Sequence, residues 1–293
     1  MVKLRKIVLR FLPLKLATIS IILWCPLVLA DVKPSSIAWI RLDFPPGYIL
    51  KGDNAGNGVY EQIIRYFSEQ LPHYDMKTVD MSRKRFWHEI QDRKNYCEVG
   101  AQRTIERQQY AYFSIPISLI PPAKIVLNQM SWEALGKPDR MSLNDLLNNR
   151  ELSGSIMSVR SYGSAVDSVL EMYESDINAN IQRQVIELGS LYSMIAMNRL
   201  DFTIDYEGLV VQFLQKQALD NLKIVTIDEE EKYHTMHVVC TKNAWGDQVI
   251  REINKIVKIH RMLDSFRQCF SAYGDTFNGE FYQRYKKDLD FSQ

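Results

Sequence analysis

Apolar residues follow two periods along this chain, a period of two in short runs and a helical period in longer ones. Residues 36–42 alternate and include β-branched and aromatic side chains, which predicts a strand that ends at the turn around Pro45 and Pro46. The next amphipathic stretch predicts a helix that stops before Pro72. Its apolar positions lie three or four residues apart: Tyr60, Ile63, Ile64, Phe67 and Leu71.

The same patterns continue to the end of the chain. Further strands are predicted over 76–79, 97–101, 113–118, 124–128, 155–159, within 181–187, and over 201–206, 224–227 and 234–241. Further helices are predicted over 82–93, 142–149, 164–173, 190–197, 209–217 and 245–263, followed by a helical, aromatic-rich tail. Alternating strands and helices indicate an α/β protein, whose functional groups gather at the carboxyl ends of strands.

The alternation also suggests two lobes, because residues 124–222 form a second α/β unit inserted into the first. The predicted divisions are a first lobe over 31–123, a second lobe over 124–222, and a return to the first lobe over 223–293. A chain of this length is too long for one small core.

The first thirty residues differ from the rest. Five basic residues without an acid precede an apolar run over 16–29, and small or modest residues then lead to Ala30. This layout predicts a secretory signal peptide over 1–30, cleaved after Ala30, and therefore export to the periplasm. An uncleaved amphipathic anchor is the alternative. No later apolar run is long enough to span a bilayer.

Charge and cysteine content follow from that cleavage. The chain has 36 basic and 35 acidic residues, so losing five basic residues leaves 31 against 35, a net charge of about −4. The mature chain has no basic stripe that would indicate nucleic-acid binding. Cys97, Cys240 and Cys269 remain, which permits one disulfide and one free thiol. His234 and His237 lack companion ligands with zinc spacing, so no metal or cofactor is predicted.

Two turns have the chemistry of anion sites. Arg107 lies just past the predicted strand 97–101, and a guanidinium there can hold a planar anion by paired hydrogen bonds, although most arginines simply face solvent. The turn Ser161-Tyr162-Gly163-Ser164 opens a helix after another strand and exposes backbone N–H groups.

With these pieces in order, the chain resembles the family 3 extracellular solute-binding proteins of bacterial ABC transporters. Members carry the run Gly-x-Thr-x-Thr-x-x-Arg before an aromatic-Ser-x-Pro strand. Here Gly100-Ala101-Gln102-Arg103-Thr104-Ile105-Glu106-Arg107 precedes Phe113-Ser114-Ile115-Pro116, and only the first Thr is replaced, by Gln102. Pro45-Pro46, Tyr162-Gly163 and Asn198-Arg199-Leu200-Asp201 extend the resemblance over the mature chain. The aromatic-Pro-Pro entry, the cysteine before the Arg motif and Cys240 with Lys242-Asn243-Ala244-Trp245-Gly246 resemble an uncharacterised branch more than the well-known amino-acid binders.

The resemblance implies the type 2 periplasmic-binding-protein fold, α/β with two lobes of mixed sheets joined by two hinge crossovers. On the first lobe it makes Arg107 the clamp for a ligand carboxylate. It adds Gln102 and Thr104 as polar contacts, and Phe44 and Trp39 as an aromatic wall.

On the second lobe the resemblance places Ser161, Tyr162 and Gly163 at the cleft. Members that bind amino acids use an Asp for the ligand ammonium. Here Tyr206 takes that place and Asp205 is the nearest acid. The resemblance therefore argues against an α-amino acid and leaves open a carboxylate, a modified peptide fragment or another polar metabolite.

The family fold further implies that the strand ending near Cys240 runs beside the strand beginning at Cys97. A Cys97–Cys240 disulfide is one expectation, and three small buried thiols are the alternative.

The function implied is capture of a small polar solute by a monomeric, non-enzymatic protein, with an ABC permease or a membrane sensor as partner. Two alternatives stay open. One is a signalling or interaction protein that has lost its ligand. The other is an enzyme similar to cyclohexadienyl dehydratases, for which Glu106, Asp205 and Glu207 are the candidate acids or bases.

Overall fold

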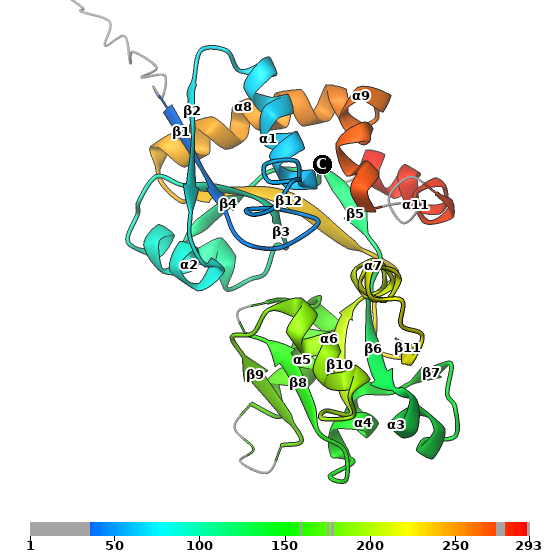
Figure 1. Cartoon of the computed structure of the whole chain (residues 1–293). Helices are drawn as coiled ribbons and strands as arrows, with labels where there is room; N and C mark the ends of the chain where they lie inside the picture. The colour runs from blue at the N-terminus through cyan, green and yellow to red at the C-terminus, as the bar shows by residue number, and fades with distance from the viewer. Residues whose placement is uncertain (1–35, 159, 175, 177–178, 274–278, 292–293) are drawn as a thin grey trace, which may run out of the picture. The chain divides into compact units, whose positions relative to one another are not determined.

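The computed structural model describes residues 36–293 except 159, 175, 177–178, 274–278 and 292–293 (Figure 1). The predicted signal peptide over 1–30 lies outside the described residues. In the part of the chain that the structure describes, no helix is both long and apolar enough to cross a membrane.

One mixed sheet has the order β2-β1-β3-β12-β4, and β5 pairs with β12 beside it. Strand β1 runs parallel to β2 and β3, whereas β12 runs antiparallel to β3, β4 and β5. A strand from late in the chain therefore lies among strands from its beginning. The strands are β1 (Ser36–Arg41), β2 (Asp75–Asp80), β3 (Cys97–Ala101), β4 (Ala111–Phe113), β5 (Ser118–Ile120) and β12 (His234–Thr241).

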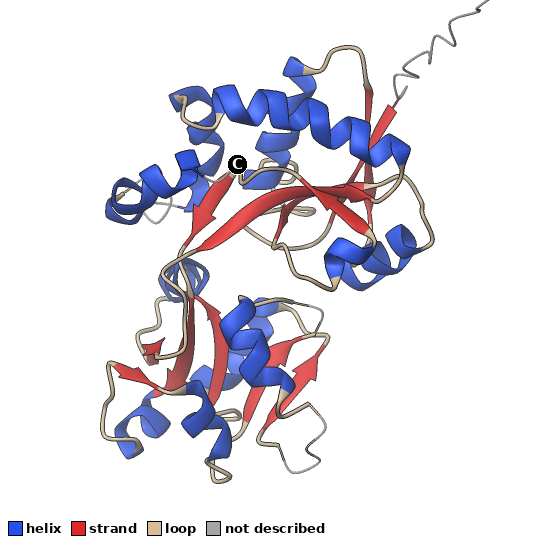
Figure 2. Ribbon diagram, turned by 180° about the vertical axis from the view of Figure 1, so that it is seen from behind, coloured by secondary structure: helices blue, strands red, loops and turns tan. Residues whose placement is uncertain are grey.

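Helices cover both faces of this sheet, and sheet and helices together are called the first lobe. Alternation along β1 directs Ile37 and Trp39 to one core, shared with α1 and α8, and Ile40 to another, shared with α2. Figures 1 and 2 show α8 and α2 on opposite sides of the sheet. The helices are α1 (Val59–Gln70), α2 (Arg83–Gln91), η1 (Arg107–Gln109), α8 (Ala244–His260), α9 (Asp264–Arg267), η2 (Gln268–Tyr273) and α11 (Glu280–Phe291).

The other mixed sheet has the order β7-β11-β6-β10-β8-β9 and forms the second lobe with its helices. Helices α4 and α5 share one core with it, and α6 and α7 share another. Its strands are β6 (Ala123–Asn128), β7 (Arg140–Met141), β8 (Gly154–Met157), β9 (Ile181–Gln184), β10 (Phe202–Tyr206) and β11 (Leu222–Ile227). Its helices are α3 (Gln129–Ala134), α4 (Leu143–Asn148), α5 (Ser164–Glu171), α6 (Leu188–Ala196) and α7 (Glu207–Gln217).

The chain passes between the lobes twice, after β5 and after β11. The second passage corrects the predicted boundary at 222/223, because β11 pairs with β6 and β7 and belongs to the second sheet. Val225 and Ile227 are buried in the second lobe's core, so the return to the first lobe follows Ile227. The predicted strand 113–118 is also split into β4 and β5 around Pro116, which lacks the N–H that a ladder needs.

The first lobe contains one disulfide. Cys97 on β3 and Cys240 on β12 are paired in the antiparallel register and are joined by a disulfide, the pairing that the resemblance implied. Cys269 is buried and free. The α/β class with two mixed sheets is as predicted.

Candidate binding site

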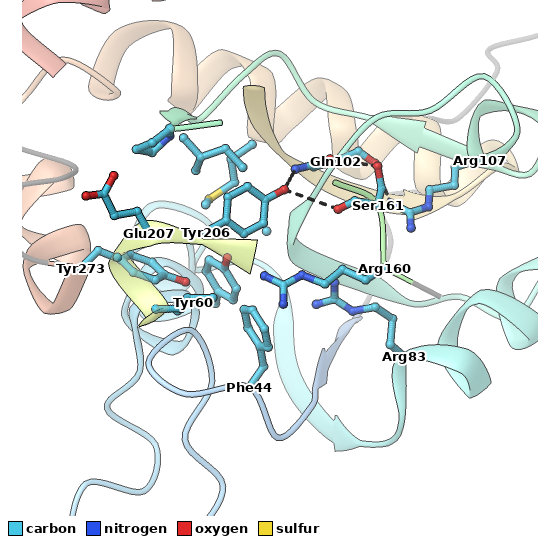
Figure 3. Close-up of a pocket in the computed structure, with 16 residues that line it drawn as sticks. Phe44, Tyr60, Arg83, Gln102, Arg107, Arg160, Ser161, Tyr206, Glu207 and Tyr273 are labelled. Atoms are coloured by element: carbon cyan, nitrogen blue, oxygen red, sulfur yellow. Dashed lines mark hydrogen bonds between the residues drawn. The ribbon is translucent and has the colours of Figure 1, made fainter. Parts of the chain in front are cut away.

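Side chains of both lobes line a pocket, here called the central cavity (Figure 3). The first lobe contributes turns at the ends of its strands together with residues of α1, α2 and η2, and the second lobe contributes the segments that follow β8 and β10. From these segments come Phe44, Tyr60, Arg83, Gly100, Gln102, Arg107, Met236 and Tyr273, and on the other side Arg160, Ser161, Tyr206, Glu207, Gly208 and Leu209.

Arg107 lies where the sequence predicts, in a turn that follows β3. Its backbone N–H donates to Thr104 Oγ1 at 3.2 Å, and its Nη1 donates to the Gln102 carbonyl oxygen at 3.0 Å. The guanidinium lies over the Trp87 ring, 4.5 Å from its centroid. Burial lowers the pKa of Arg107, with a further contribution from Arg83. The turn and Trp87 therefore fix the direction of a buried cation.

Helix α2 supplies the support beneath this cation. Arg83 and Trp87 are one helical turn apart, so both face the same side. Arg83 Nη2 lies 3.1 Å from the Glu98 carboxylate, and its guanidinium lies over the Phe44 ring, 5.4 Å from the centroid. Burial raises the pKa of Glu98, opposed by attraction to Arg83 and Arg107.

Gln102 connects the two lobes across the central cavity. Its Nε2 donates to the Tyr206 hydroxyl, and its Oε1 accepts from Ser161 Oγ at 3.0 Å (Figure 3). Tyr206 in turn donates to the Ser161 carbonyl oxygen at 3.4 Å. The replacement of Thr by Gln102 thus gives the first lobe a side chain long enough to bond to the second.

Arg160 is a cavity residue that the sequence reasoning missed. Its Nη2 lies 2.7 Å from Asp205 Oδ1, and its Nη1 donates to Asp205 Oδ2 at 3.1 Å. Burial opposes the charged form, but attraction to Asp205 outweighs it and raises the pKa of Arg160. Arg160 follows β8, and Asp205 is the residue before the last of the adjacent parallel strand β10. Because the two residues are 45 positions apart, no local sequence signal connects them.

Three aromatic rings surround the Arg160 guanidinium. Its central carbon lies 5.2 Å from the centroid of Phe44, 5.4 Å from that of Tyr162 and 5.0 Å from that of Tyr206. These distances are in the range of cation–π attraction. Because Phe44 belongs to the first lobe, this cluster also joins the two lobes.

Two more missed residues, Tyr60 and Tyr273, form an aromatic floor. Gly100 has φ +96°, and a Cβ there would lie 2.4 Å from Tyr60 Cζ, so only glycine lets β3 and this ring approach so closely. Burial raises the pKa of both tyrosines, which are hydrogen-bonded to each other. Tyr273 comes from η2, so the C-terminal segment takes part in the site.

Several predicted ligand contacts contribute no surface to the central cavity. Trp39 is fully buried in the first lobe and stacks on Phe67, because it shares a strand face with Ile37. Tyr162 is fully buried in the second lobe, where its hydroxyl accepts from the Met157 N–H at 3.0 Å. Asp205 is 1% exposed and engaged by Arg160.

The remaining predicted residues divide between the central cavity and a second pocket, here called the outer groove. Phe44, Gln102, Arg107, Ser161 and Tyr206 line the central cavity, as described above. Thr104 and Gly163 line the outer groove, which adjoins the central cavity through Gln102, Arg107, Arg160 and Ser161.

The three residues predicted as candidate acids or bases lie in three different surroundings. Glu106 lines the outer groove and accepts a hydrogen bond from the Tyr110 hydroxyl at 3.2 Å. Asp205 forms the ion pair with Arg160, and Glu207 is exposed at the cavity rim. Among the described residues, no group of three or more His, Cys, Asp or Glu side chains is arranged to hold a metal.

No family model matches the sequence, and no curated protein matches it either. Solved structures do. A Streptococcus mutans structure, from a study of glutathione import via GshT and the cystine importer TcyBC, has a TM-score of 0.64 at 14% identity, with 82% of this chain and 95% of that one covered. An ancestral arginine-binding protein bound to arginine has a TM-score of 0.63 at 15% identity, over 82% and 98%.

A histidine kinase sensor domain with similarity to periplasmic binding proteins is equally close, with a TM-score of 0.63 at 12% identity over 83% and 97%. At such identities the likeness shows the fold. The chain therefore has the type 2 periplasmic-binding-protein fold that its sequence resemblance implied.

Proposed function

We propose that this protein binds a small, carboxylate-bearing solute in the central cavity and closes its two lobes around it. The observation that carries the proposal is the cavity itself, which both lobes line and in which Arg107 is held rigidly by its own turn and by Trp87. A preorganised guanidinium fork matches a carboxylate by paired, charge-assisted hydrogen bonds.

The lining supports binding without chemistry. Aromatic rings of Phe44, Tyr60, Tyr206 and Tyr273 offer apolar walls, and Ser161 and Gln102 offer polar contacts that orient a ligand. A ligand that touches both lobes binds the closed form more strongly than the open form, and this difference shifts the equilibrium between them.

The proposed setting is the periplasm, with a monomeric protein that hands its solute to a membrane transporter or reports it to a sensor. Both roles occur among proteins of similar fold, which include a substrate-binding protein of an amino acid ABC transporter and the histidine kinase sensor domain.

The direct experiment is mass spectrometry of small molecules released from the purified protein, followed by a thermal-shift screen of carboxylates. A true ligand at a hundredfold excess over its dissociation constant stabilises the protein by about 3 kcal/mol. The matched control is Arg107→Ala, which removes the fork. A screen that moves wild type and Arg107→Ala equally would refute the proposed clamp.

A second candidate is a signalling or interaction protein that no longer takes a solute. The observation that favours it is the direct bonding of Gln102 to Ser161 and Tyr206, which joins the lobes through the protein's own side chains. For this candidate the released fraction contains no specific solute, and no carboxylate shifts the melting temperature.

A further inference from the structure

We infer that Arg160 fills the cation-binding subsite of the central cavity from within the chain, so that the solute binds as an anion with no cationic group of its own. The statement about the solute rests on the proposed function. The statement about Arg160 is independent of it.

The surroundings of Arg160 are those of a cation-binding subsite. A carboxylate, Asp205, lies at 2.7 Å, and the rings of Phe44, Tyr162 and Tyr206 lie 5.0–5.4 Å from the guanidinium carbon. Carboxylates and aromatic faces together are the groups that hold free ammonium and guanidinium ligands. Here the guanidinium that they hold is the chain's own.

Asp205 has no capacity left for a second cation. Its Oδ1 lies 2.7 Å from Arg160 Nη2 and accepts from the Tyr206 N–H at 2.7 Å. Its Oδ2 accepts from Arg160 Nη1 at 3.1 Å and from the Tyr192 hydroxyl at 2.8 Å. A carboxylate has about four lone-pair sites, and these four contacts use them. A ligand ammonium would have to displace Arg160.

The other acids near the central cavity do not replace Asp205. Asp167, in the outer groove, already accepts from Ser161 Oγ at 2.5 Å and from the Tyr162 N–H at 2.9 Å. The Glu98 side chain is 1% exposed and lies 3.1 Å from Arg83. Glu207 is exposed, and in Figure 3 its carboxylate points away from Arg83 and Arg160. Facing the cavity instead are three guanidinium groups, those of Arg83, Arg107 and Arg160. Two of them are already paired with carboxylates, Arg83 with Glu98 and Arg160 with Asp205, so the positive charge that attracts an anion and repels an ammonium comes mainly from Arg107.

The first test asks whether a free cation can replace the Arg160 side chain. In Arg160→Ala, methylguanidinium at about ten times its dissociation constant is expected to raise the melting temperature by at least about 2 °C, while wild type does not respond. Arg140→Ala is the matched control, because it removes an exposed guanidinium from another Arg–Asp pair of the second lobe, with Asp228.

The double variant Arg160→Ala/Asp205→Asn removes the charge that receives the cation and is expected to lose the rescue. If Arg160→Ala does not fold by itself, the folded yield on refolding with and without methylguanidinium replaces the melting temperature. Equal shifts in Arg160→Ala and Arg140→Ala, or an undiminished rescue in the double variant, would overturn the assignment of Arg160.

The second test uses wild-type protein and pairs of compounds that differ only in an α-ammonium: phenylalanine and 3-phenylpropionate, glutamate and glutarate, arginine and 5-guanidinopentanoate. The ammonium-free member of the first or second pair is expected to bind at least tenfold more tightly than its partner. Tighter binding of the amino acids would overturn the inference about the solute. If no member of any pair binds, the proposed function is contradicted. The assignment of Arg160 is then judged only by the methylguanidinium rescue of Arg160→Ala.

Discussion

The two lobes each direct a buried arginine at the central cavity, and the two arginines have different partners. Arg107 on the first lobe is 9% exposed and donates to a neutral carbonyl oxygen, that of Gln102. Arg160 on the second lobe is 7% exposed and is paired with a carboxylate, that of Asp205. The comparison teaches that the surroundings decide the role: Arg107 is positioned at the cavity by its own turn and by the Trp87 ring, whereas Arg160, engaged by both oxygens of a buried carboxylate, stabilises the protein itself.

The largest expected effect comes from breaking the second lobe's pair. Arg160→Ala leaves Asp205 buried without its counter-charge, which costs about 3–5 kcal/mol in the free energy of unfolding. Urea denaturation measures the loss. The matched change Arg140→Ala removes an exposed pair and is expected to cost less than about 1 kcal/mol. Equal losses in the two variants would show that the Arg160–Asp205 pair is not a stabilising element.

The next largest effect is expected from removing the disulfide of the first lobe. The Cys97–Cys240 disulfide ties β3, which leads to the Arg107 turn, to a strand 143 residues later, and the second lobe has no cysteine. Replacing both cysteines by alanine is expected to lower the free energy of unfolding by about 2–5 kcal/mol. Calorimetric melting under oxidising conditions measures it. An unchanged melting temperature would contradict a stabilising bond.

A pH titration tests a buried titratable group of the first lobe, His237 on β12. Burial lowers the pKa of His237 to about 4, while its Nδ1 bonds to the Ser114 carbonyl oxygen at 2.7 Å. The unfolded chain therefore binds more protons between pH 6.5 and 4. The contribution of neutral His237 to the free energy of unfolding is therefore fully present above pH 6.5. It falls by about 3 kcal/mol as the pH drops through this window.

His237→Asn keeps a side-chain amide donor near the Nδ1 position and cannot take up the proton. Its free energy of unfolding is expected to fall less than that of wild type between pH 7 and pH 4, as measured by urea denaturation at each pH. Parallel curves for the two proteins would mean that His237 does not cause the acid loss.

The smallest expected effect concerns the bridge between the lobes. Gln102→Ala removes the hydrogen bonds to Tyr206 and Ser161. The net contribution of one hydrogen bond to the free energy of unfolding is about 1 kcal/mol. A double-mutant cycle with Tyr206→Phe, measured by urea denaturation, isolates the coupling between these two side chains. A coupling energy indistinguishable from zero would remove Gln102 as a connection between the lobes.

Much of the fold could be predicted because it follows from periodicity. Strands such as β3 and β12 and the helix α8 were expected near their observed positions, since their apolar alternation or stripe is long and clear. The boundary near 222 could not be predicted, because β11 has the same apolar pattern whichever sheet it joins. Strand pairing over nearly a hundred residues decides that question, and periodicity carries no information about it.

The site was predictable where a motif fixes local geometry and not where it depends on distant contacts. Arg107 and Gln102 came from one turn with recognisable spacing. Arg160 is a lone arginine whose partner, Asp205, lies 45 residues later, so its role appears only when β8 and β10 are side by side. Trp39 and Tyr162 were placed at the cleft by resemblance, whereas the strand face of Trp39 and the packing of Tyr162 between β8 and α5 bury them in the two cores.

The central claim, that Arg107 clamps a carboxylate between the lobes, is tested most directly by calorimetric titration of one bound carboxylate into wild type, Arg107→Lys and Arg107→Ala. The account predicts that Arg107→Ala weakens binding by about 10- to 150-fold, the equivalent of one charge-assisted hydrogen bond of about 1.5–3 kcal/mol. Arg107→Lys, which keeps the charge and loses the fork, should fall between the two. Equal affinity in all three proteins would contradict the account.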